Sequence, residues 1–405
     1  MNRRAFTTLL LGSAMGSIAA TTGGCSAGGP SPDGTTQHAI KRAYEFLDHR
    51  VDEAAGTHQG LPRSYTGGYM ARHHSTVAFT YDVALTIIAY CARGTKADVA
   101  RAAALSRTLV ALQEQDAEDD GRLRQSYASG RLPTGREVPE AAAADTFTGT
   151  LAWAGLALLH AHRATGTAAF RSGAVRAAQW IQREASSSTG TPGYSGGINA
   201  QGDEVRWKSS EHNADVAGFF RALAGTVDDD TWGSRADTAV AFLDAMWDGE
   251  QGAFWTGTGT DGTTVNRTPV PEDPQTWSYL ATRNSRHAAS LDWARKHLAA
   301  EDGGFVGVSV SDADTSKVWF EGTAHLVCAL RVRNGDRDGE QADRLLTSLR
   351  SAQAHAPHAD AYGLVAASSD GLDTGDGDRL YASLHTGTTA WFALAARRAN
   401  PFVLQ

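Results

Sequence analysis

The chain has 405 residues and a formal net charge of −8 at neutral pH. An acidic surface of this kind argues against nucleic acid and anionic lipid headgroups as partners. The length allows two average domains or one large one. We see no domain boundary, and we expect a single catalytic domain over residues 37–405.

The first 24 residues carry the features of an export signal. A basic start, Arg3-Arg4, precedes a short apolar run and a series of small residues. The adjacent arginines indicate the twin-arginine route, and Cys25 stands where a lipoprotein carries its lipid. The alternative is simple cleavage nearby. We expect an exported protein on the outer face of the cell membrane, anchored only by a lipid on Cys25, with residues 25–36 as a flexible tether.

From residue 37 onward, one pattern occurs six times. A short segment containing Thr, Gly, Pro or an acidic residue precedes a helix that is apolar nearly all round, so the helix must be enclosed. These inner helices are expected at residues 83–90, 151–159, 214–223, 277–282, 324–330 and 389–396.

Amphipathic helices alternate with the apolar ones. Their apolar residues recur at three- and four-residue steps, which is typical of helices that cover a core from outside. They are expected at residues 37–50, 97–115, 168–184, 232–248, 285–298 and 338–354. Six enclosed and six covering helices predict an all-α fold, the (α/α)6 toroid.

Consecutive inner helices of a toroid run in the same direction, so their N-termini meet at one rim. The segments that lead into them are long, and connections of this length are usually functional. Some are expected to hold short β-hairpins, such as GAFWTGT before GTTVNRT and GGFVGVSV before KVWFEG. The leading segments are residues 59–79, 117–146, 187–210, 249–273, 301–320 and 355–386.

The stretch WKSSEHNADVAGFF is the most concentrated polar motif at that rim. It places Glu211, His212, Asn213 and Asp215 at the start of a predicted helix, with Ser209 and Ser210 as N-cap candidates. The bland interpretation is that these acids only complement the helix dipole. We favour a working site, in which His212, Asn213 and Asp215 position a sugar or tune Glu211.

Acidic residues recur at the other inner-helix starts, as Asp82, Asp145 and Glu321. Carboxylates gathered in one crevice raise each other's pKa. A protonated carboxyl beside an ionised one is the pair that cleaves glycosidic bonds. We therefore predict Glu211 as the general acid and Asp82 as the base that activates water, with Asp145 or Glu321 as its substitute.

Aromatic and histidine side chains accompany these acids. Aromatic rings pack on the flat C–H faces of sugars, and the candidates are Tyr81, Trp207, Trp277 and Trp319, whereas Trp153 and Trp391 fit a core position better. His325 and His385 are either structural or available for acid/base work. The sequence lacks a His-Glu-x-x-His spacing, a Walker loop, a dinucleotide-binding glycine motif and a nucleophile elbow, so we expect no metal and no cofactor.

Several segments occur in the same order in a family of bacterial exported proteins. They include TYDVAL, GRLRQSYASG, TGTLAWAGLALL, KSSEHNAD, FWTGT, VWFEGTA, SSDGLDTG, HTGTTAWFALA and the closing NPF. The sequence resembles this family, which is similar to the six-hairpin glycosidases. The resemblance covers almost all of residues 37–402 and implies an (α/α)6 glycosidase-like fold and a carbohydrate-active domain. The adjacent Asp-Asp motif of the endo-mannanase branch has no counterpart that we can identify.

These observations predict a monomeric glycoside hydrolase that acts on an oligo- or polysaccharide, with inversion at the anomeric carbon. One alternative is a polysaccharide lyase or sugar epimerase on the same toroid, working through Tyr and His. Another is a non-catalytic surface lipoprotein that binds glycans.

Overall fold

The computed structural model describes residues 36–55, 60–73, 76–132 and 136–404. The predicted export signal, Cys25 and the tether up to residue 35 lie outside this range. The described part is mainly helical, as predicted, and each of the twelve segments expected to be helical contains a helix.

The six predicted inner helices are α3, α5, α7, α9, α11 and α13. All are buried along most of their length, and in α5 every residue from 148 to 161 is buried. Their bounds are Thr80–Arg93, Thr148–Thr165, Ser210–Ala224, Asp273–Thr282, Phe320–Arg333 and Thr386–Ala396.

The predicted outer helices are α1, α4, α6, α8, α10 and α12. Each packs on an inner helix: α4 on α3, α6 on α5, α8 on α7, α10 on α9, α12 on α11 and α1 on α13. Their bounds are Thr36–Ala54, Lys96–Gln115, Ala168–Trp180, Thr231–Met246, Ala289–His297 and Asp338–His355. A π-helical turn, Ile181–Ala185, continues α6.

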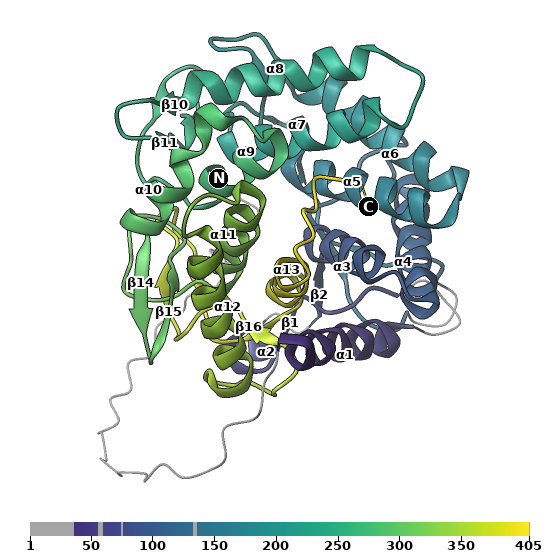
Figure 1. Cartoon of the computed structure of the whole chain (residues 1–405). Helices are drawn as coiled ribbons and strands as arrows, with labels where there is room; N and C mark the ends of the chain where they lie inside the picture. The colour runs from purple at the N-terminus through teal and green to yellow at the C-terminus, as the bar shows by residue number, and fades with distance from the viewer. Residues whose placement is uncertain (1–35, 56–59, 74–75, 133–135, 405) are drawn as a thin grey trace, which may run out of the picture.

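The inner helices follow one another round a closed cycle. Each one, from α3 to α11, contacts the next in chain order, and α13 contacts α3. Figure 1 shows this ring with the outer helices around it. A closed cycle explains the apolar composition of these helices, because each has neighbours on both sides as well as an outer helix behind it.

The remaining elements are short. They comprise the helix α2 (Gly68–His73), a 3₁₀ turn (Ser285–His287) and strands arranged as small antiparallel sheets. The strands are β1 Tyr65–Thr66, β2 Val77–Phe79, β3 Ser126–Ala128, β4 Ala141–Ala143, β5 Thr146–Phe147, β6 Ser186–Ser187, β7 Gly193–Tyr194, β8 Gly197–Ile198, β9 Glu204–Val205, β10 Trp247–Asp248, β11 Ala253–Phe254, β12 Gly257–Thr258, β13 Val265–Asn266, β14 Ala299–Asp302, β15 Phe305–Val308, β16 Leu364–Val365, β17 Leu372–Asp373, β18 Arg379–Leu380 and β19 Leu384–His385.

The predicted hairpins are present in part. Strands β12 and β13 pair where GAFWTGT was expected to meet GTTVNRT, with Gly257 opposite Asn266. The second expectation was wrong in its pairing. The strand β15 pairs along its length with the preceding β14, and KVWFEG meets β15 through one isolated bridge, between Trp319 and Val308.

Glycine at the second position of two inner-helix motifs allows neighbouring helices to approach closely. A Cβ on Gly387 would lie 2.4 Å from Oδ1 of Asp82, and one on Gly149 would lie 2.7 Å from Oδ2 of Asp215. Both distances are too short for a real contact. The Thr-Gly-Thr motifs therefore leave room for a carboxylate from the next helix of the ring.

The C-terminal segment runs from α13 toward α5 at one end of the ring (Figure 1). Asn400 Nδ2 donates to Leu280 O at 2.9 Å, and His160 Nε2 donates to Pro401 O at 2.8 Å. The ring of Phe402 lies 4.9 Å from that of Trp153 between centroids. The closing NPF segment thus fills this end of the ring with side chains.

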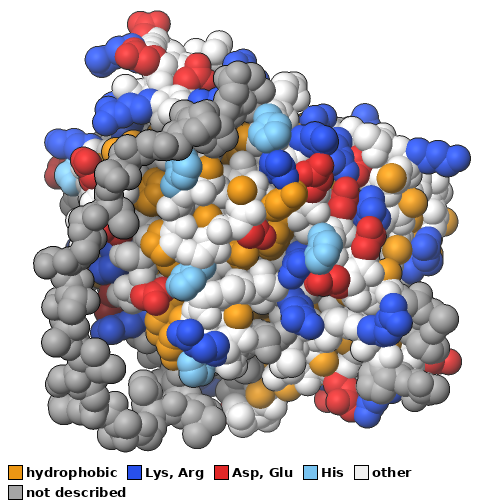
Figure 2. Space-filling model, turned by 90° about the horizontal axis from the view of Figure 1, so that it is seen from below, with side chains coloured by type: hydrophobic (Ala, Val, Ile, Leu, Met, Phe, Trp, Pro, Cys, Tyr) orange, Lys and Arg blue, Asp and Glu red, His pale blue; other side chains and the backbone are white. Residues whose placement is uncertain are grey.

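The surface carries charges of both signs. Figure 2 shows Lys and Arg interspersed with Asp and Glu on one face, with hydrophobic side chains concentrated near its centre. In the part of the chain that the structure describes, no helix combines the length and hydrophobicity needed to cross a bilayer. The side chains of Cys91 and Cys328 are both free thiols.

Replacement of Phe402 by Ala is expected to lower the free energy of unfolding by about 3–5 kcal/mol, because it removes a buried ring and leaves a cavity. The side chain of Phe402 is 5% exposed, whereas that of the adjacent Val403 is 39% exposed. Val403→Ala is the matched control and should change stability by no more than about 0.5 kcal/mol. Urea denaturation of both variants measures the difference, and equal losses would contradict the account of this segment.

Candidate active site

A cavity of about 250 Å³ lies where the inner helices begin. Five of the six inner helices contribute a polar side chain from the helix start or from the residue just before it: Asp82, Glu211, Asp273, Glu321 and His385. Tyr65, Phe79, Tyr81 and Trp319 add aromatic surface to its wall. The parallel direction of the inner helices therefore brings groups that are far apart in the sequence to one place.

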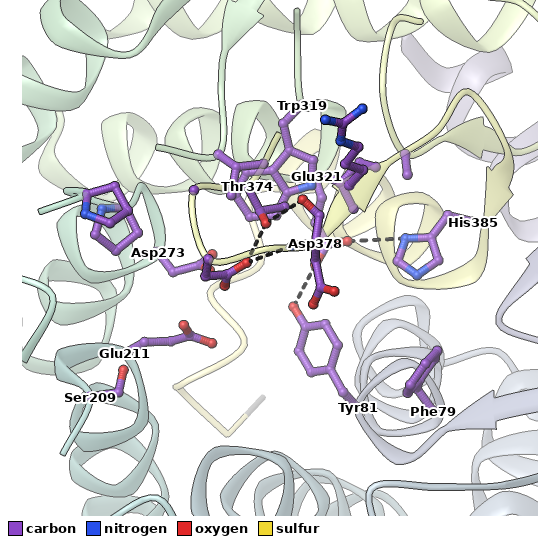
Figure 3. Close-up of a pocket in the computed structure, with 18 of the residues that line it drawn as sticks. Phe79, Tyr81, Ser209, Glu211, Asp273, Trp319, Glu321, Thr374, Asp378 and His385 are labelled. Atoms are coloured by element: carbon purple, nitrogen blue, oxygen red, sulfur yellow. Dashed lines mark hydrogen bonds and ion pairs between the residues drawn. The ribbon is translucent and has the colours of Figure 1, made fainter. Parts of the chain in front are cut away.

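The structure brings together six of the site residues that the sequence predicts. They are Tyr81, Asp82, Glu211, Trp319, Glu321 and His385, and all of them line the cavity. Figure 3 shows Glu211 across the cavity from Tyr81 and His385. Glu211 enters from α7, where Ser209 accepts a hydrogen bond from the backbone N–H of His212 as the N-cap. This N-cap fixes where α7 starts.

Asp82 and Glu321 are linked through His385. The Nε2–H of His385 donates to Asp82 Oδ2 at 3.1 Å, and Nδ1 lies 3.3 Å from Glu321 Oε2. Nδ1 also lies 2.9 Å from Thr388 Oγ1 and 3.2 Å from the backbone N of Thr388. A neutral ring could accept from that N–H. The two flanking carboxylates favour the charged ring, which donates to Thr388 Oγ1 instead.

Glu321 has hydrogen-bond donors on both oxygens. Tyr81 Oη donates to Oε1 at 2.8 Å, and Thr388 Oγ1 donates to Oε2 at 3.2 Å. Trp391 Nε1 donates in turn to Tyr81 Oη at 2.7 Å. These contacts hold the Glu321 carboxylate in one orientation at the base of the cavity.

His325 lies directly behind Glu321 and contacts three carboxylates. Its Nδ1 is 3.1 Å from Glu272 Oε2 and 3.3 Å from Asp273 Oδ1, and its Nε2 is 3.8 Å from Glu321 Oε1. Three tryptophans surround the imidazole, with ring centroids 4.3–5.1 Å away: Trp277, Trp319 and Trp391. Negative charges and aromatic faces both stabilise a cation at this position.

The pKa values follow from this arrangement. Burial alone would lower the pKa of both histidines, but the carboxylates raise that of His325 to about 10 and that of His385 to about 9. Burial opposes ionisation of Glu321, yet contacts with His325 and His385 hold its pKa well below the usual range. The expected mutual raising of carboxyl pKa values therefore does not occur at Glu321. The pKa of Glu272 is raised to about 7, chiefly by burial, and the charge of Asp273 adds to the rise.

Seven predicted residues lie outside the cavity lining. Asn213 uses its amide to hold backbone: Nδ2 donates to Tyr194 O and Ser209 O, and Oδ1 accepts from Tyr194 N. It is a structural residue, because these contacts occupy the donors and acceptor that a sugar would need. Asp145 instead caps a turn by accepting from Ala200 N at 3.0 Å.

The other five residues lie among the packed side chains around the cavity. His212 and Asp215 lie against Gly149 of α5, and the ring of Trp207 lies 5.3 Å from that of His212 between centroids. Trp277 packs in the core between Trp153 and Trp391. His325 is fully buried behind the cavity. These residues support the wall, and they do not face the cavity.

Sequence reasoning missed several charged residues at the site. Asp273 stands directly before Pro274, and an acidic residue at an inner-helix start was the signal that identified the others. Asp376, Asp378 and Arg379 come from the hairpin between β17 and β18, which reaches the cavity from the loop before α13. Only the density of Asp and Gly in SSDGLDTGDGDRL could have pointed to that loop.

One group among the described residues has the spacing of a metal site. Glu272, Asp273 and His325 each place one ligand atom within 4.8 Å of the others. The imidazolium of His325 supplies a positive charge to these carboxylates, and its Nδ1 is hydrogen-bonded to Glu272 Oε2 at 3.1 Å. Within the described part of the chain, Glu272 Oε1, Asp273 Oδ1 and His325 Nε2 have no hydrogen-bond partner.

No protein-family model matches the sequence, and no curated protein matches it either. Solved structures with the same fold include a D-mannose isomerase, at 10% identity and a TM-score of 0.65, covering 92% of this chain and 99% of that one. A glycosidase variant in complex with glucose gives 15% identity and a TM-score of 0.60, covering 90% and 99%. A glycoside hydrolase family 76 mannosidase from Bacteroides thetaiotaomicron gives 12% and 0.61, covering 89% and 97%. The chain shares their fold.

Replacement of His325 by Gln is expected to destabilise the protein by about 3–5 kcal/mol at neutral pH, because it leaves buried carboxylates without their counter-charge. His355→Gln is the control, since His355 is exposed at the end of α12. Thermal or urea unfolding measures both. A His325→Gln protein as stable as the control would show that the imidazole carries no charge there.

The contribution of His385 to stability is expected to fall at alkaline pH. Its folded pKa, about 9, lies above the ordinary histidine value of 6.5, so the charged ring stabilises the fold fully below about pH 6.5. This contribution is lost as the pH rises through about 9. The difference in unfolding free energy between wild type and His385→Gln should shrink between pH 6.5 and pH 10. A difference that is constant over this range would contradict the assignment.

Proposed function

We propose that the protein is a sugar-processing enzyme, and specifically a glycoside hydrolase with Glu211 as general acid and Asp82 as general base. The observation that carries the proposal is that carboxylates from three separate inner-helix starts, Asp82, Glu211 and Glu321, line one cavity with Tyr81 and Trp319. Paired carboxyl groups beside aromatic surface are what glycosidic cleavage requires. The closed cycle of six helices supports assignment of the fold as an (α/α)6 toroid.

Asp82 is better placed than Glu321 to act as the general base. Glu321 has a donor on each oxygen, so it is held as a positioning residue. Asp82 is bonded through Oδ2 to His385, and among the described residues no donor is bonded to its Oδ1. That oxygen can accept a proton from water. Asp145 is not proposed again, because it does not line the cavity.

The reaction follows from these positions. The Glu211 carboxyl gives its proton to the glycosidic oxygen as the bond from that oxygen to the anomeric carbon breaks. Asp82 takes a proton from a water molecule, whose oxygen forms the new bond to the anomeric carbon. Attack from the face opposite the leaving group inverts the configuration. His385 orients Asp82 through its hydrogen bond to Oδ2.

The neighbours in fold are consistent with sugar chemistry but differ in reaction type. They include glycosidases, a family 76 mannosidase, a D-mannose isomerase and a sugar epimerase. One of the glycosidase structures contains glucose, and others are variants of the same kind of enzyme. We carry over to this chain only the class of ligand, a sugar.

A second candidate is an isomerase or epimerase. It is favoured by one observation: His385 lines the cavity, carries a raised pKa and lies beside Tyr81 through their shared contact with Glu321. Such an enzyme moves a proton on sugar carbon. Incubation of monosaccharides in deuterium oxide discriminates, because isomerisation introduces deuterium at carbon and hydrolysis does not.

We also propose that the protein acts outside the cytoplasm as a monomer held by a lipid on Cys25. The twin arginines and the small residues before Cys25 support the export and the lipid anchor. Labelling of the expressed protein with a fatty-acid analogue, with Cys25→Ala as the control, tests it.

Replacement of Glu211 by Gln is expected to reduce the turnover of the glycan that the enzyme cleaves by at least about 100-fold, because it removes the general acid. The loss should be much smaller on a dinitrophenyl glycoside, whose leaving group needs no proton. Glu204→Gln is the matched control, since Glu204 is an exposed acid on β9 in the segment leading to α7. Steady-state kinetics on both substrates measure the effect. Unchanged turnover in the Glu211→Gln enzyme would show that another group is the acid.

A further inference from the structure

Three loops on one side of the cavity are joined by hydrogen bonds. They are residues 256–271, 309–314 and 366–380, which we call the loop wall. Val270 N donates to Asp312 Oδ1 at 2.7 Å, and Ser311 Oγ donates to Thr374 O at 2.9 Å. The first bond joins the first loop to the second, and the other joins the second to the third. The three loops therefore form one continuous surface.

The loop wall is tightly packed where its loops meet. Gly375 has φ +86°, and a Cβ on it would lie 2.8 Å from both Ala313 Cβ and Pro269 Cγ. Not even a methyl group fits there, so the three loops are in contact at this junction and leave no gap for a sugar chain at this point. Pro269, Thr374 and Gly375 line the cavity, so this junction faces the ligand space directly.

The loop wall is continued by contacts with residues 65–70. The backbone N–H of Met70 donates to Ser383 Oγ at 3.0 Å, and the ring of Tyr69 stacks on Tyr381 at 3.9 Å between centroids. Tyr65 stacks on His385 at 4.3 Å. The cavity is therefore bounded without interruption from the first loop of the wall round to Tyr65.

Asp82, the proposed general base, and the positioning residue Glu321 lie at the bottom of this enclosure. Asp82 and Glu321 are each only 2% exposed, and behind them Trp153, Trp277 and Trp391 are fully packed. The C-terminal segment closes the ring behind those tryptophans, with Phe402 against Trp153. A polysaccharide that reached these carboxylates would meet a closed base and a closed side.

From this geometry we propose that the cavity accepts one terminal sugar residue, so that the enzyme releases monosaccharides from chain ends and does not cut within chains. This inference rests on the proposed sugar-processing function and specifies its substrate: a chain end with free hydroxyls on its last ring. The carboxylates around the bottom of the cavity, Asp82, Glu211 and Asp273, can each bond to hydroxyls of that ring. The rest of the glycan would extend out of the cavity into solvent.

Product sizing tests the proposal. Linear oligosaccharides of mannose and glucose, with each common linkage and a fluorescent label at the reducing end, are incubated with the soluble domain. We expect labelled products that are each one sugar shorter, together with free monosaccharide from the earliest time points. Release of unlabelled fragments of two or more sugars at early times would overturn the proposal and leave the hydrolase assignment intact.

Binding to the Glu211→Gln variant provides a test that does not depend on turnover. Calorimetry compares D-mannose and D-glucose with linear oligosaccharides that end in the same sugar. If one residue fills the site, their affinities should agree within about threefold, because the added sugars make few contacts. A gain of about tenfold or more per added sugar, about 1.4 kcal/mol each, would overturn the proposal. Monosaccharide binding without cleavage of any glycan by the wild type would support a pocket for one sugar residue, but it would reject release from chain ends together with the hydrolase assignment.

Discussion

The site depends on a buried row of alternating charges. It begins at Asp82 on α3, passes through His385 before α13 and Glu321 on α11 to His325, and ends at Glu272 and Asp273 at the start of α9. Each carboxylate would be costly to bury alone, and so would each imidazolium. In alternation, Glu321 and the two histidines stabilise one another's charged forms. This is why both histidines have raised pKa values and Glu321 a lowered one.

The same row ties the ring together. It crosses from α3 to α13, from α13 to α11 and from α11 to α9, which are successive neighbours in the cycle of inner helices. The aromatic cluster behind it supplies the apolar contacts, and the hydroxyl of Tyr81 links the two by accepting from Trp391 and donating to Glu321. The position of the site's carboxylates is therefore set by the packing of the fold. Few of the surrounding side chains are free to adjust, which suits a site that must hold groups in one geometry.

Hydrolysis and isomerisation would use this arrangement differently. A hydrolase needs Glu211, which stands apart from the row and across the cavity from His385 (Figure 3). An isomerase needs a proton carrier on the row itself. The enclosed bottom of the cavity is compatible with a chain end and with a free monosaccharide. The shape of the cavity therefore limits the size of the substrate, but it does not distinguish hydrolysis from isomerisation. In the two-carboxylate mechanism, Glu211 is the second carboxyl group beside Asp82.

The sequence by itself determined the helical elements and which of them are enclosed, because a helix that is apolar all round can only be buried. It also placed Asp82, Glu211 and Glu321 at helix starts that a parallel inner layer brings to one rim. It could not distinguish a rim acid from a capping one, so Asp145 was grouped with the others although its carboxylate caps the turn at Ala200. Nor could it show that the side-chain amide of Asn213 is hydrogen-bonded to the backbone of Tyr194. It also could not show that Asp376 and Asp378 reach the cavity, because the path of a loop is set by its contacts with other loops. Only the tertiary structure decided the pairing of His325 and His385 with particular carboxylates, since those partners are separated by up to 303 positions and meet only when the ring closes.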